Sequence, residues 1–472
     1  MLNTLNDVLN NVDNFIWGMP LIILILFTGI LLTVRLRGLQ IRHLGKALHY
    51  VFHNEDDGEG EVTSFGALCT ALSATIGTGN IVGCATAIVA GGPGALFWMW
   101  LAAFFGMATK YAEGMLAVKY RVIAEDGHTL GGPFYYIEKG MGKNFKWLAK
   151  LFCVFGTMVG LFGIGTFTQV NGITSAVNNF FDPSNVHTIS LFGMNYSISV
   201  VVAGIIVTIC AGLVIIGGIT KVSEVIVPFM AVTYIGVCLI IVFTHLPQVP
   251  AAFAEIVQSA FGLKAVAGGA IGAMTVAMQK GIARGIFSNE AGLGSAPIAA
   301  AAAQTNEPVR QGLVSMTGTF IDTIIVCTMT GLAIVMTGAW DMGLEGVAVT
   351  TKAFALGLPF PAKASAFVLM MCLVFFAFTT ILGWAYYSER CLEYLVNGKK
   401  FVITAFKWFY ILAVFIGPFM TVSAVWTIAD ICNGLMAFPN LVALLALNGD
   451  VVSETRGYLE RVGIVKTTVG EA

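Results

Sequence analysis

A short run of glycine and small polar residues interrupts an apolar stretch in the N-terminal part of the chain. The sequence "SATIGTGNIVG" places Gly77, Thr78, Gly79 and Asn80 in succession, and such residues disfavour a continuous helix. Unwound backbone is tolerated at membrane depth only where it is buried in protein or lines a cavity. Its freed carbonyls can bind a cation, and the N–H groups that begin a half-helix can bind a carboxylate. The run therefore predicts a binding site for a cation and a small anion or zwitterion.

This run has two other possible interpretations. A dinucleotide-binding glycine loop follows a strand and has an acidic residue about 20 positions later, whereas here both flanks are apolar and helical and the spacing is GxGxxxG. Close helix packing is a stronger alternative, because Gly79 and Gly83 form a GxxxG motif. Packing alone leaves the polar residues unexplained, so the broken helix is favoured.

The composition identifies the kind of protein that must position this run. Of 472 residues, 57% are hydrophobic and 11% are charged, and the mean hydropathy is +0.84. No soluble domain has this composition. Apolar stretches of about 20 residues recur throughout the chain, which indicates an all-α polytopic membrane protein. A β-barrel would show weak alternating segments of about 10 residues instead.

Hydropathy predicts eleven transmembrane helices. Their expected ranges are 15–34, 63–90, 94–118, 147–180, 196–217, 221–244, 264–303, 309–337, 362–396, 401–422 and 424–447. The fourth, seventh and ninth segments are too long for a simple span, so each must be tilted, broken or partly outside the bilayer. Residues 247–262 are expected to form a short amphipathic helix at the membrane surface.

The distribution of basic residues predicts the orientation. If the N-terminus is outside, most of the 25 Lys and Arg residues fall in inner segments, and the outer segments hold only Lys264, Lys352 and Lys363. Cytoplasmic loops carry such an excess of positive charge. The expected topology therefore has the N-terminus outside and the C-terminus in the cytoplasm.

A second glycine-rich interruption suggests an internal repeat. "SNEAGLGSAP", Ser288 to Pro297, lies within the seventh segment and resembles the first run, since both contain Gly-x-Gly followed by small residues. The two runs occupy the first helix of two five-helix blocks that begin on opposite sides of the membrane, as an inverted repeat requires. The predicted divisions are an N-terminal helix and linker (1–62), a first repeat (63–244), a second repeat (245–448) and a cytoplasmic tail (449–472).

Four motifs give the chain a family resemblance. "SATIGTGNIVG", "GGPGALFWMW", "GMATKYAEG" and "GIARGIFSNEAGLGSAP" resemble the alanine or glycine:cation symporter family, and the resemblance covers nearly the whole chain. It implies a LeuT-like fold of five plus five helices with one extra N-terminal helix and two broken helices. It also implies symport of alanine or glycine with Na⁺ or, in some members, H⁺.

The resemblance further implies which residues form the site. The expected substrate contacts lie on the two breaks and two further helices: Thr78, Gly79, Asn80, Gln169, Phe287, Ser288, Asn289 and Trp384. The expected Na⁺ ligands are the carbonyls of Ser73, Ile76 and Phe376 and the hydroxyls of Thr379 and Thr380, since hard cations prefer oxygen. Phe376 departs from the wider fold, where a small residue is usual. Without the family, Thr379 and Thr380 are more simply explained as hydroxyls that bond the preceding helical turn.

Charged residues within apolar segments are costly and are usually paired or functional. Lys110 and Glu113 are interpreted as a pair that snorkels to the inner surface. Arg284 and Asp322 are expected to pair with Glu290 or with each other in a structural ion network. Proton coupling or gating is the alternative role of these charged residues.

The nine cysteines form no CxxC motif, so no disulfide framework is expected. Among the six histidines only His49 and His53 have i,i+4 spacing, and they lack a third ligand, so no metal centre is expected.

The expected function is Na⁺-coupled symport of alanine or glycine into the cell by alternating access, and H⁺-coupled symport is the alternative. An ion channel would require a continuous polar pore, and an intramembrane enzyme would require a motif such as HExxH or GxSxG, which the sequence lacks. The expected partners are the small amino acid and the lipid bilayer of a prokaryotic plasma (inner) membrane. Neither a nucleic acid nor an obligate protein partner is expected.

The predicted orientation can be tested by thiol labelling in intact cells. A cysteine that replaces Asn6 should react with an impermeant thiol reagent added outside, and a cysteine that replaces Glu454 should react only after the membrane is permeabilised. The opposite pattern would show that the charge bias has been assigned to the wrong side.

Overall fold

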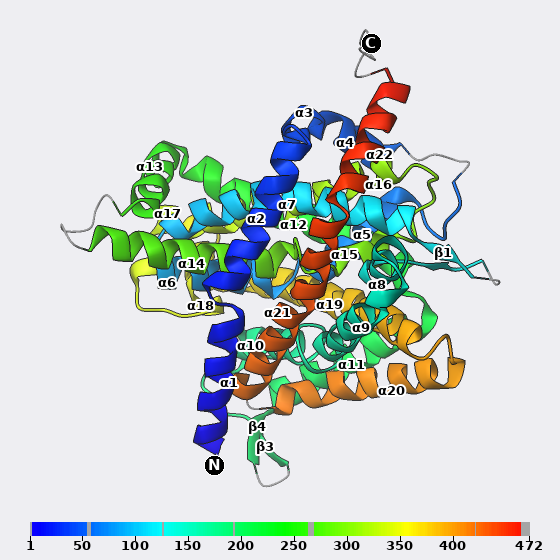
Figure 1. Cartoon of the computed structure of the whole chain (residues 1–472). Coiled ribbons are helices and arrows are strands. Elements are labelled where there is room, and N and C mark those ends of the chain that lie inside the picture. The colour runs from blue at the N-terminus through cyan, green and yellow to red at the C-terminus, as the bar shows by residue number, and fades with distance from the viewer. Residues whose placement is uncertain are drawn as a thin grey trace, which may run out of the picture.

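The computed structural model describes residues 2–53, 58–124, 127–191, 194–262, 269–420 and 422–463. The predicted outer Lys264, the inner-tail Lys466 and the first five residues of the predicted segment 264–303 lie outside them. The chain begins with α1 (Leu2–Ile16), α2 (Met19–Arg35), α3 (Leu39–Arg42) and α4 (Leu44–Phe52). Figure 1 shows α1 and α22 (Asn448–Arg461) at opposite ends of the molecule. The hydropathy pattern correctly located α2 but not α1.

The predicted first repeat contains helices and two short antiparallel β-ribbons, β1 with β2 and β3 with β4. Its elements are α5 (Ser64–Thr75), η1 (Gly79–Gly83), α6 (Cys84–Gly91), α7 (Gly94–Lys119), β1 (Val122–Ile123), β2 (Thr129–Leu130), α8 (Pro133–Tyr136), η2 (Ile137–Met141), η3 (Lys143–Phe145), α9 (Lys146–Phe162), α10 (Phe167–Phe181), β3 (Thr188–Leu191), β4 (Met194–Ser197), α11 (Ile198–Gly217) and α12 (Ile219–Thr244).

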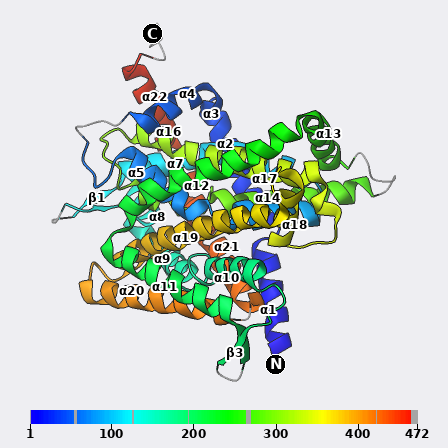
Figure 2. The same ribbon diagram turned by 180° about the vertical axis from the view of Figure 1, so that it is seen from behind.

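The remainder of the chain is helical in its described part. Its elements are η4 (Leu246–Gln248), α13 (Val249–Ala260), α14 (Ala270–Asn289), α15 (Ala296–Ala300), α16 (Pro308–Thr319), η5 (Phe320–Cys327), α17 (Thr328–Thr337), η6 (Ala339–Asp341), α18 (Val347–Gly357), α19 (Ala362–Leu395), α20 (Lys400–Ile416), η7 (Gly417–Phe419), α21 (Val422–Ala446) and α22. Figures 1 and 2 show that α2 and α21 lie on one face of the molecule and α11 and α12 on the opposite face.

Two of the three overlong segments are broken, as their length required. The segment 147–180 divides into α9 and α10, and the segment 264–303 divides into α14 and α15. The ninth segment instead forms one continuous helix of 34 residues, α19. The first glycine run also interrupts its segment, because the helices on its two sides are bent by 54°.

The number of membrane spans is only partly established by helix length and apolarity. Seven helices of the described chain are long and apolar enough to cross a membrane, or up to nine if each bent pair is one span. The predicted count of eleven is therefore not confirmed. The predicted amphipathic helix at 247–262 corresponds to α13.

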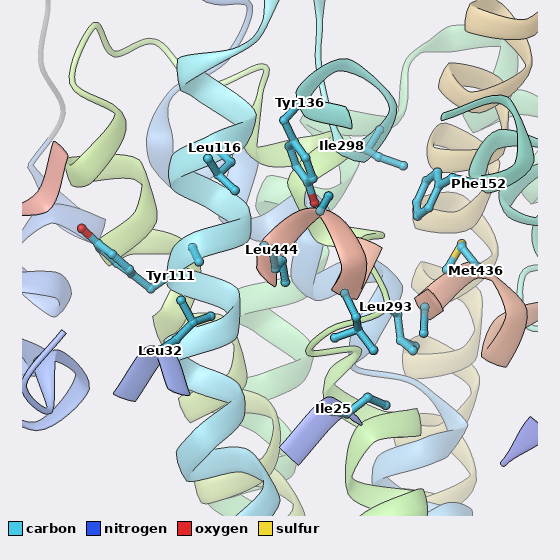
Figure 3. Close-up of a cluster of buried hydrophobic side chains, with 14 of the residues drawn as sticks. Ile25, Leu32, Tyr111, Leu116, Tyr136, Phe152, Leu293, Ile298, Met436 and Leu444 are labelled. Atoms are coloured by element: carbon cyan, nitrogen blue, oxygen red, sulfur yellow. The ribbon is translucent and has the colours of Figure 1, made fainter. Parts of the chain in front are cut away.

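The largest hydrophobic core surrounds the second glycine run. Figure 3 shows Ile25 from α2 and Leu444 from α21 near Leu293, which lies in the connection between α14 and α15. Leu293 is fully buried. A connection without helical hydrogen bonds is thus packed against apolar side chains from two helices, which gives its backbone a defined position.

The helices α5 and α19 approach each other closely at Gly383. A Cβ atom added to Gly383 would lie 2.6 Å from the backbone nitrogen of Ala74, a distance at which something must move. This close approach brings the C-terminal end of α5 against the middle of α19, where Thr379 and Thr380 lie.

We therefore expect Gly383→Ala to destabilise the protein by about 1–3 kcal/mol, the usual range for overpacking. Thermal unfolding of the purified protein in detergent measures this change. The control is Gly236→Ala in α12, because a Cβ atom there would meet nothing within 4 Å. Equal unfolding temperatures for the two variants would contradict the close contact.

Candidate functional site

The first break is stabilised by side chains that replace helical hydrogen bonds. In a continuous helix the N–H groups of Gly77 and Thr78 would bond the carbonyls of Ser73 and Ala74. Instead, Gly77 N–H donates to Oδ1 of Asn80 at 2.9 Å and Thr78 N–H donates to Oε1 of Gln169 at 3.4 Å. The break therefore turns carbonyls at the end of α5 away from their usual donors, and it satisfies its own N–H groups with two amide side chains.

The second break begins where α14 ends. Glu290 adopts a left-handed conformation with φ 56°, and Oδ1 of Asn289 accepts the N–H of Ala291 at 2.9 Å. Gly292 and Gly294 also have positive φ, at 90° and 80°, which side chains rarely tolerate. The sequence GLG at this point thus meets a backbone requirement, and the chain returns to a helix only at α15.

A single carboxylate from η5 joins the two breaks. Oδ1 of Asp322 accepts Nδ2 of Asn80 from the first break at 2.7 Å, and Oδ2 accepts Oγ of Ser288, just before the second, at 2.9 Å. The hydroxyl of Thr323 also donates to Oδ2, at 2.7 Å, and accepts Nδ2 of Asn289 at 3.0 Å. All five side chains are buried, so this network fixes the two breaks relative to each other.

The two breaks are also in direct contact. A Cβ atom added to Gly79 would lie 3.3 Å from Cα of Ser288 and 3.5 Å from the ring of Phe287. Six of the expected substrate residues therefore come together here, namely Thr78, Gly79, Asn80, Phe287, Ser288 and Asn289. Gln169 joins them through its bond to Thr78. The side chain of Asn80 is committed to Gly77 and Asp322, so its role in this conformation is to shape the break.

Most of the expected cation ligands also converge. The hydroxyl of Thr380 lies 3.4 Å from the carbonyl oxygen of Ile76 and 3.1 Å from that of Phe376. The hydroxyl of Thr379 donates to Phe376 at 3.0 Å. Both threonines thus bond the preceding turn of α19, but Thr380 reaches α5 as well. The Phe376 carbonyl oxygen therefore lies beside both hydroxyls. The oxygens that come together here are all neutral, and such ligands suit a hard cation such as Na⁺. The hydroxyl of Ser73 bonds Thr70, so only its backbone oxygen is a candidate.

Trp384 lies beside the second break and bonds the carboxylate there. Its indole N–H donates to Oε1 of Glu290 at 3.0 Å, and Ser295 donates to the other oxygen. The expectation that Arg284 and Asp322 pair with Glu290 or with each other is wrong, since neutral donors bond the carboxylates of both Glu290 and Asp322. The guanidinium of Arg284 instead lies 5.5 Å from the ring centre of Phe287.

The interpretation of Lys110 and Glu113 as a snorkelling pair is also wrong. Lys110 is 3% exposed and Glu113 is fully buried, and the Lys110 ammonium has no hydrogen-bond partner in the described part of the chain. Oε1 of Glu113 accepts the N–H groups of Gly292 and Gly294, at 3.1 and 3.2 Å, and Nδ2 of Asn440 at 2.7 Å. Glu113 therefore stabilises the second break from the side of α7.

The sequence shows Asp322 only as a charge in an apolar segment and does not reveal its position as a bridge between the breaks. Its partners Asn80 and Ser288 lie on other helices, and no spacing in the sequence reveals them. The π-helical stretch η5 places both Asp322 and Cys327 within hydrogen-bond distance of Asn80 and Ser288. This stretch also has no clear signal in the sequence. Such turns often mark functional positions.

Comparisons with known proteins agree with this architecture. Residues 2–469 match the sodium:alanine symporter family. The chain belongs to that family. It is 45% identical over 465 residues to the sodium/alanine symporter AgcS of Methanococcus maripaludis, which covers 96% of this chain and 97% of that protein. It is 36% identical over 464 residues to the probable sodium/glutamine symporter GlnT of Bacillus subtilis, which covers 97% of this chain and 91% of that protein.

A solved structure supports the fold. The crystal structure of MhsT in complex with L-phenylalanine superposes with a TM-score of 0.58 at 12% identity, over 84% of this chain and 93% of that one. The predicted LeuT-like fold and the family resemblance are thus confirmed. This member of the sodium:alanine symporter family is a polytopic amino-acid symporter and not an enzyme.

The bridge through Asp322 leads to a prediction. In Asp322→Asn one carboxylate oxygen becomes an NH₂ group that faces a donor, so a buried polar group loses its partner at a cost of about 1–3 kcal/mol. We expect amino-acid uptake by the reconstituted variant to fall at least tenfold while the protein still inserts. Asp341→Asn in η6 is the matched control because Asp341 is exposed. Normal uptake by Asp322→Asn would show that the bridge does not set the site.

Proposed function

We propose that the protein couples Na⁺ entry to the uptake of alanine or glycine by alternating access. The close contact between Gly79 and the segment that holds Phe287 and Ser288 carries this proposal, because it leaves little room for a substrate side chain. The names of the relatives support coupling to sodium. They do not agree on the substrate, since AgcS is named for alanine and GlnT for glutamine.

The proposed substrate site lies between the two breaks. The carboxylate would bind the N–H groups near Gly79, after the N–H of Thr78 that bonds Gln169, where the first break precedes a helix and the helix dipole favours negative charge. The ammonium would bind carbonyl oxygens around Phe287 and Ser288. The ring of Phe287, with Trp384 beside Glu290, would limit the length of the side chain. Gln169 and Asn289 would act through the backbone of the breaks that they bond.

Na⁺ would bind where α5 and α19 meet, as the second cargo of the transporter. The proposed ligands are the carbonyl oxygens of Ser73, Ile76 and Phe376 and the hydroxyls of Thr379 and Thr380. The first two belong to a broken helix and the last three to a continuous one, so the ion would hold α5 against α19. Alternating access in such folds moves one helix bundle against the rest around a central site. We place the N-terminus outside and the C-terminus inside an inner membrane, from the distribution of Lys and Arg.

Uptake and competition assays in proteoliposomes test the substrate and the coupling ion. Labelled alanine should accumulate under an imposed Na⁺ gradient, and glycine should compete with it, serine less well, and leucine or phenylalanine hardly at all, because a rigid wall rejects larger groups by clash. Uptake driven equally well by an H⁺ gradient without Na⁺ would contradict Na⁺ coupling. Strong competition by leucine or glutamine would contradict the small site, and failure to exchange labelled for unlabelled alanine would point to a channel.

The cation site leads to a separate prediction for Thr380→Val, which removes the hydroxyl and keeps the shape. Loss of one oxygen ligand should raise the Na⁺ concentration for half-maximal uptake at least threefold, with little change in protein abundance. The control is Thr208→Val in α11, a threonine that also bonds the preceding turn, at 2.7 Å. Wild-type Na⁺ activation of Thr380→Val would place the ion elsewhere.

A further inference from the structure

Three arginines lie on the turn that follows the first membrane span. The candidate span that begins in α1 ends at Arg35, and Arg37 and Arg42 follow it on the way to α4. The side chains of all three are exposed. Two apolar side chains beside them are exposed as well, Val34 at 69% and Ile41 at 67%. We call these five residues the arginine surface, and the function proposed above gives it no role.

The turn that carries the arginine surface is fixed to the rest of the protein. Leu36, Leu39 and Gln40 are buried. Nε2 of Gln40 donates to the hydroxyl of Thr33 at 2.9 Å and to the backbone oxygen of Phe104, in α7, at 3.3 Å. Two buried leucines and a buried amide thus give the backbone between the arginines a defined position.

No carboxylate in the described part of the chain forms an ion pair with these arginines. Arg35, Arg37 and Arg42 have neither an ion pair nor a side-chain hydrogen bond among the described residues. The other arginines of the predicted inner segments each bond a carboxylate or backbone oxygens there, namely Arg121, Arg310, Arg390, Arg456 and Arg461. The charge of the arginine surface is therefore available to an external partner.

The neighbouring basic side chains do not extend this surface. The ammonium of Lys46 lies 5.4 Å from the ring centre of Tyr50 and 5.6 Å from that of Tyr458, so it faces α22. Burial lowers the pKa of His43, and the positive charges of Arg42 and Lys46 lower it further. His43 therefore stays neutral at pH 7, and the three arginines supply the charge.

The position of the surface selects a membrane lipid as its partner. Figure 1 shows α3 and α4 at the same end of the molecule as α22, the end that the charge distribution places inside. Since the span ends at Arg35, the guanidinium groups lie at the level of the lipid headgroups. A dissolved anion would leave Val34 and Ile41 uncovered, whereas a lipid covers them with its acyl chains.

The choice of arginine goes beyond what membrane orientation requires. Positive charge that orients a span needs no particular geometry, and lysine provides it as well as arginine does. Arginine differs because its planar guanidinium binds a phosphate group through two parallel hydrogen bonds. Three such groups on a fixed turn therefore favour a partner that carries phosphate.

We propose that the arginine surface binds the phosphate groups of anionic phospholipids in the inner leaflet. The guanidinium groups of Arg35, Arg37 and Arg42 donate to phosphate oxygens, and Val34 and Ile41 contact the acyl chains. Basic segments beside a membrane span are attracted to anionic lipids in this way. The proposal does not depend on the transported substrate, and it uses the orientation given above only to name the leaflet.

Native mass spectrometry of the full-length protein tests the arginine surface. The purified protein in detergent is titrated with phosphatidylglycerol and, separately, with phosphatidylcholine of the same acyl chains. The unmodified protein should bind phosphatidylglycerol at least about tenfold more tightly, because each basic side chain at headgroup level adds to the attraction. The combined variant Arg35→Gln, Arg37→Gln, Arg42→Gln should reduce this preference to about twofold or less.

The matched control replaces three exposed lysines of the predicted inner side. Lys143→Gln, Lys399→Gln and Lys400→Gln together remove the same net charge from positions outside the arginine surface. This variant should keep the preference of the unmodified protein, because the surface is intact.

A second variant serves if the glutamine variant does not insert. Arg35→Lys, Arg37→Lys and Arg42→Lys together keep the charge that orients the first span and remove the planar groups. This variant should bind phosphatidylglycerol at least about threefold more weakly than the unmodified protein. Unchanged affinity would contradict phosphate binding by the guanidinium groups.

Four results would overturn the proposal. Equal affinity of the unmodified protein for the two lipids would show that the surface does not select anionic headgroups. An equal loss in the lysine control would assign the preference to net charge. Displacement of phosphatidylglycerol by inorganic phosphate at the same concentration would indicate an ion site, and dimers that only the arginine variant loses would assign the surface to a second copy of this chain.

Discussion

The carboxylate of Asp322 is the contact on which the arrangement of the two breaks depends. Each break exposes backbone groups in the interior of a membrane protein, where an unsatisfied polar group costs several kcal/mol. Asn80 satisfies one of these groups, the N–H of Gly77, and gives its own amide hydrogens to Asp322. Ser288 donates to the other oxygen of the same carboxylate. The distance between two segments more than 200 residues apart in sequence is thereby set by one side chain with two acceptors.

The surroundings of Asp322 explain why it can hold this position. It lies in η5, a π-helical stretch between α16 and α17, and the wider turn departs from the regular spacing of an α-helix. Glu113 has the equivalent function on the opposite side of the second break, where it accepts two backbone N–H groups and the amide of Asn440. Glu113 thus accepts backbone N–H groups of the second break directly, whereas Asp322 accepts the side chains of Asn80 and Ser288 at the two breaks.

The sequence predicts the breaks well and their partners poorly. Runs of glycine beside small polar residues are a local signal, so both interruptions, at 77–80 and 290–295, could be found without a structure. The partners come from distant helices and are chosen by geometry. Glu113 looks like one half of an ion pair with Lys110 because the two are three residues apart, but its acceptors face a connection that the sequence cannot place. The helix α1 was missed because polar residues interrupt its apolar ones, so hydropathy gave no span there.

The strengths of the hydrogen bonds separate the fixed parts of the site from those that must change during transport. Bonds to a charged group contribute about 1.5–3 kcal/mol each, and bonds between neutral groups about 0.5–1.5 kcal/mol. The bonds of Asp322 and Glu113 are of the first kind, and they lie within and between the breaks. The hydroxyls of Thr379 and Thr380 make bonds of the second kind, to a carbonyl of their own helix. A hydroxyl that bonds its own helix can turn its lone pairs to a cation at little cost in free energy, because the α-helix keeps its backbone hydrogen bonds. The protein therefore fixes the framework with carboxylates and uses neutral oxygens where a cargo ion must bind and leave.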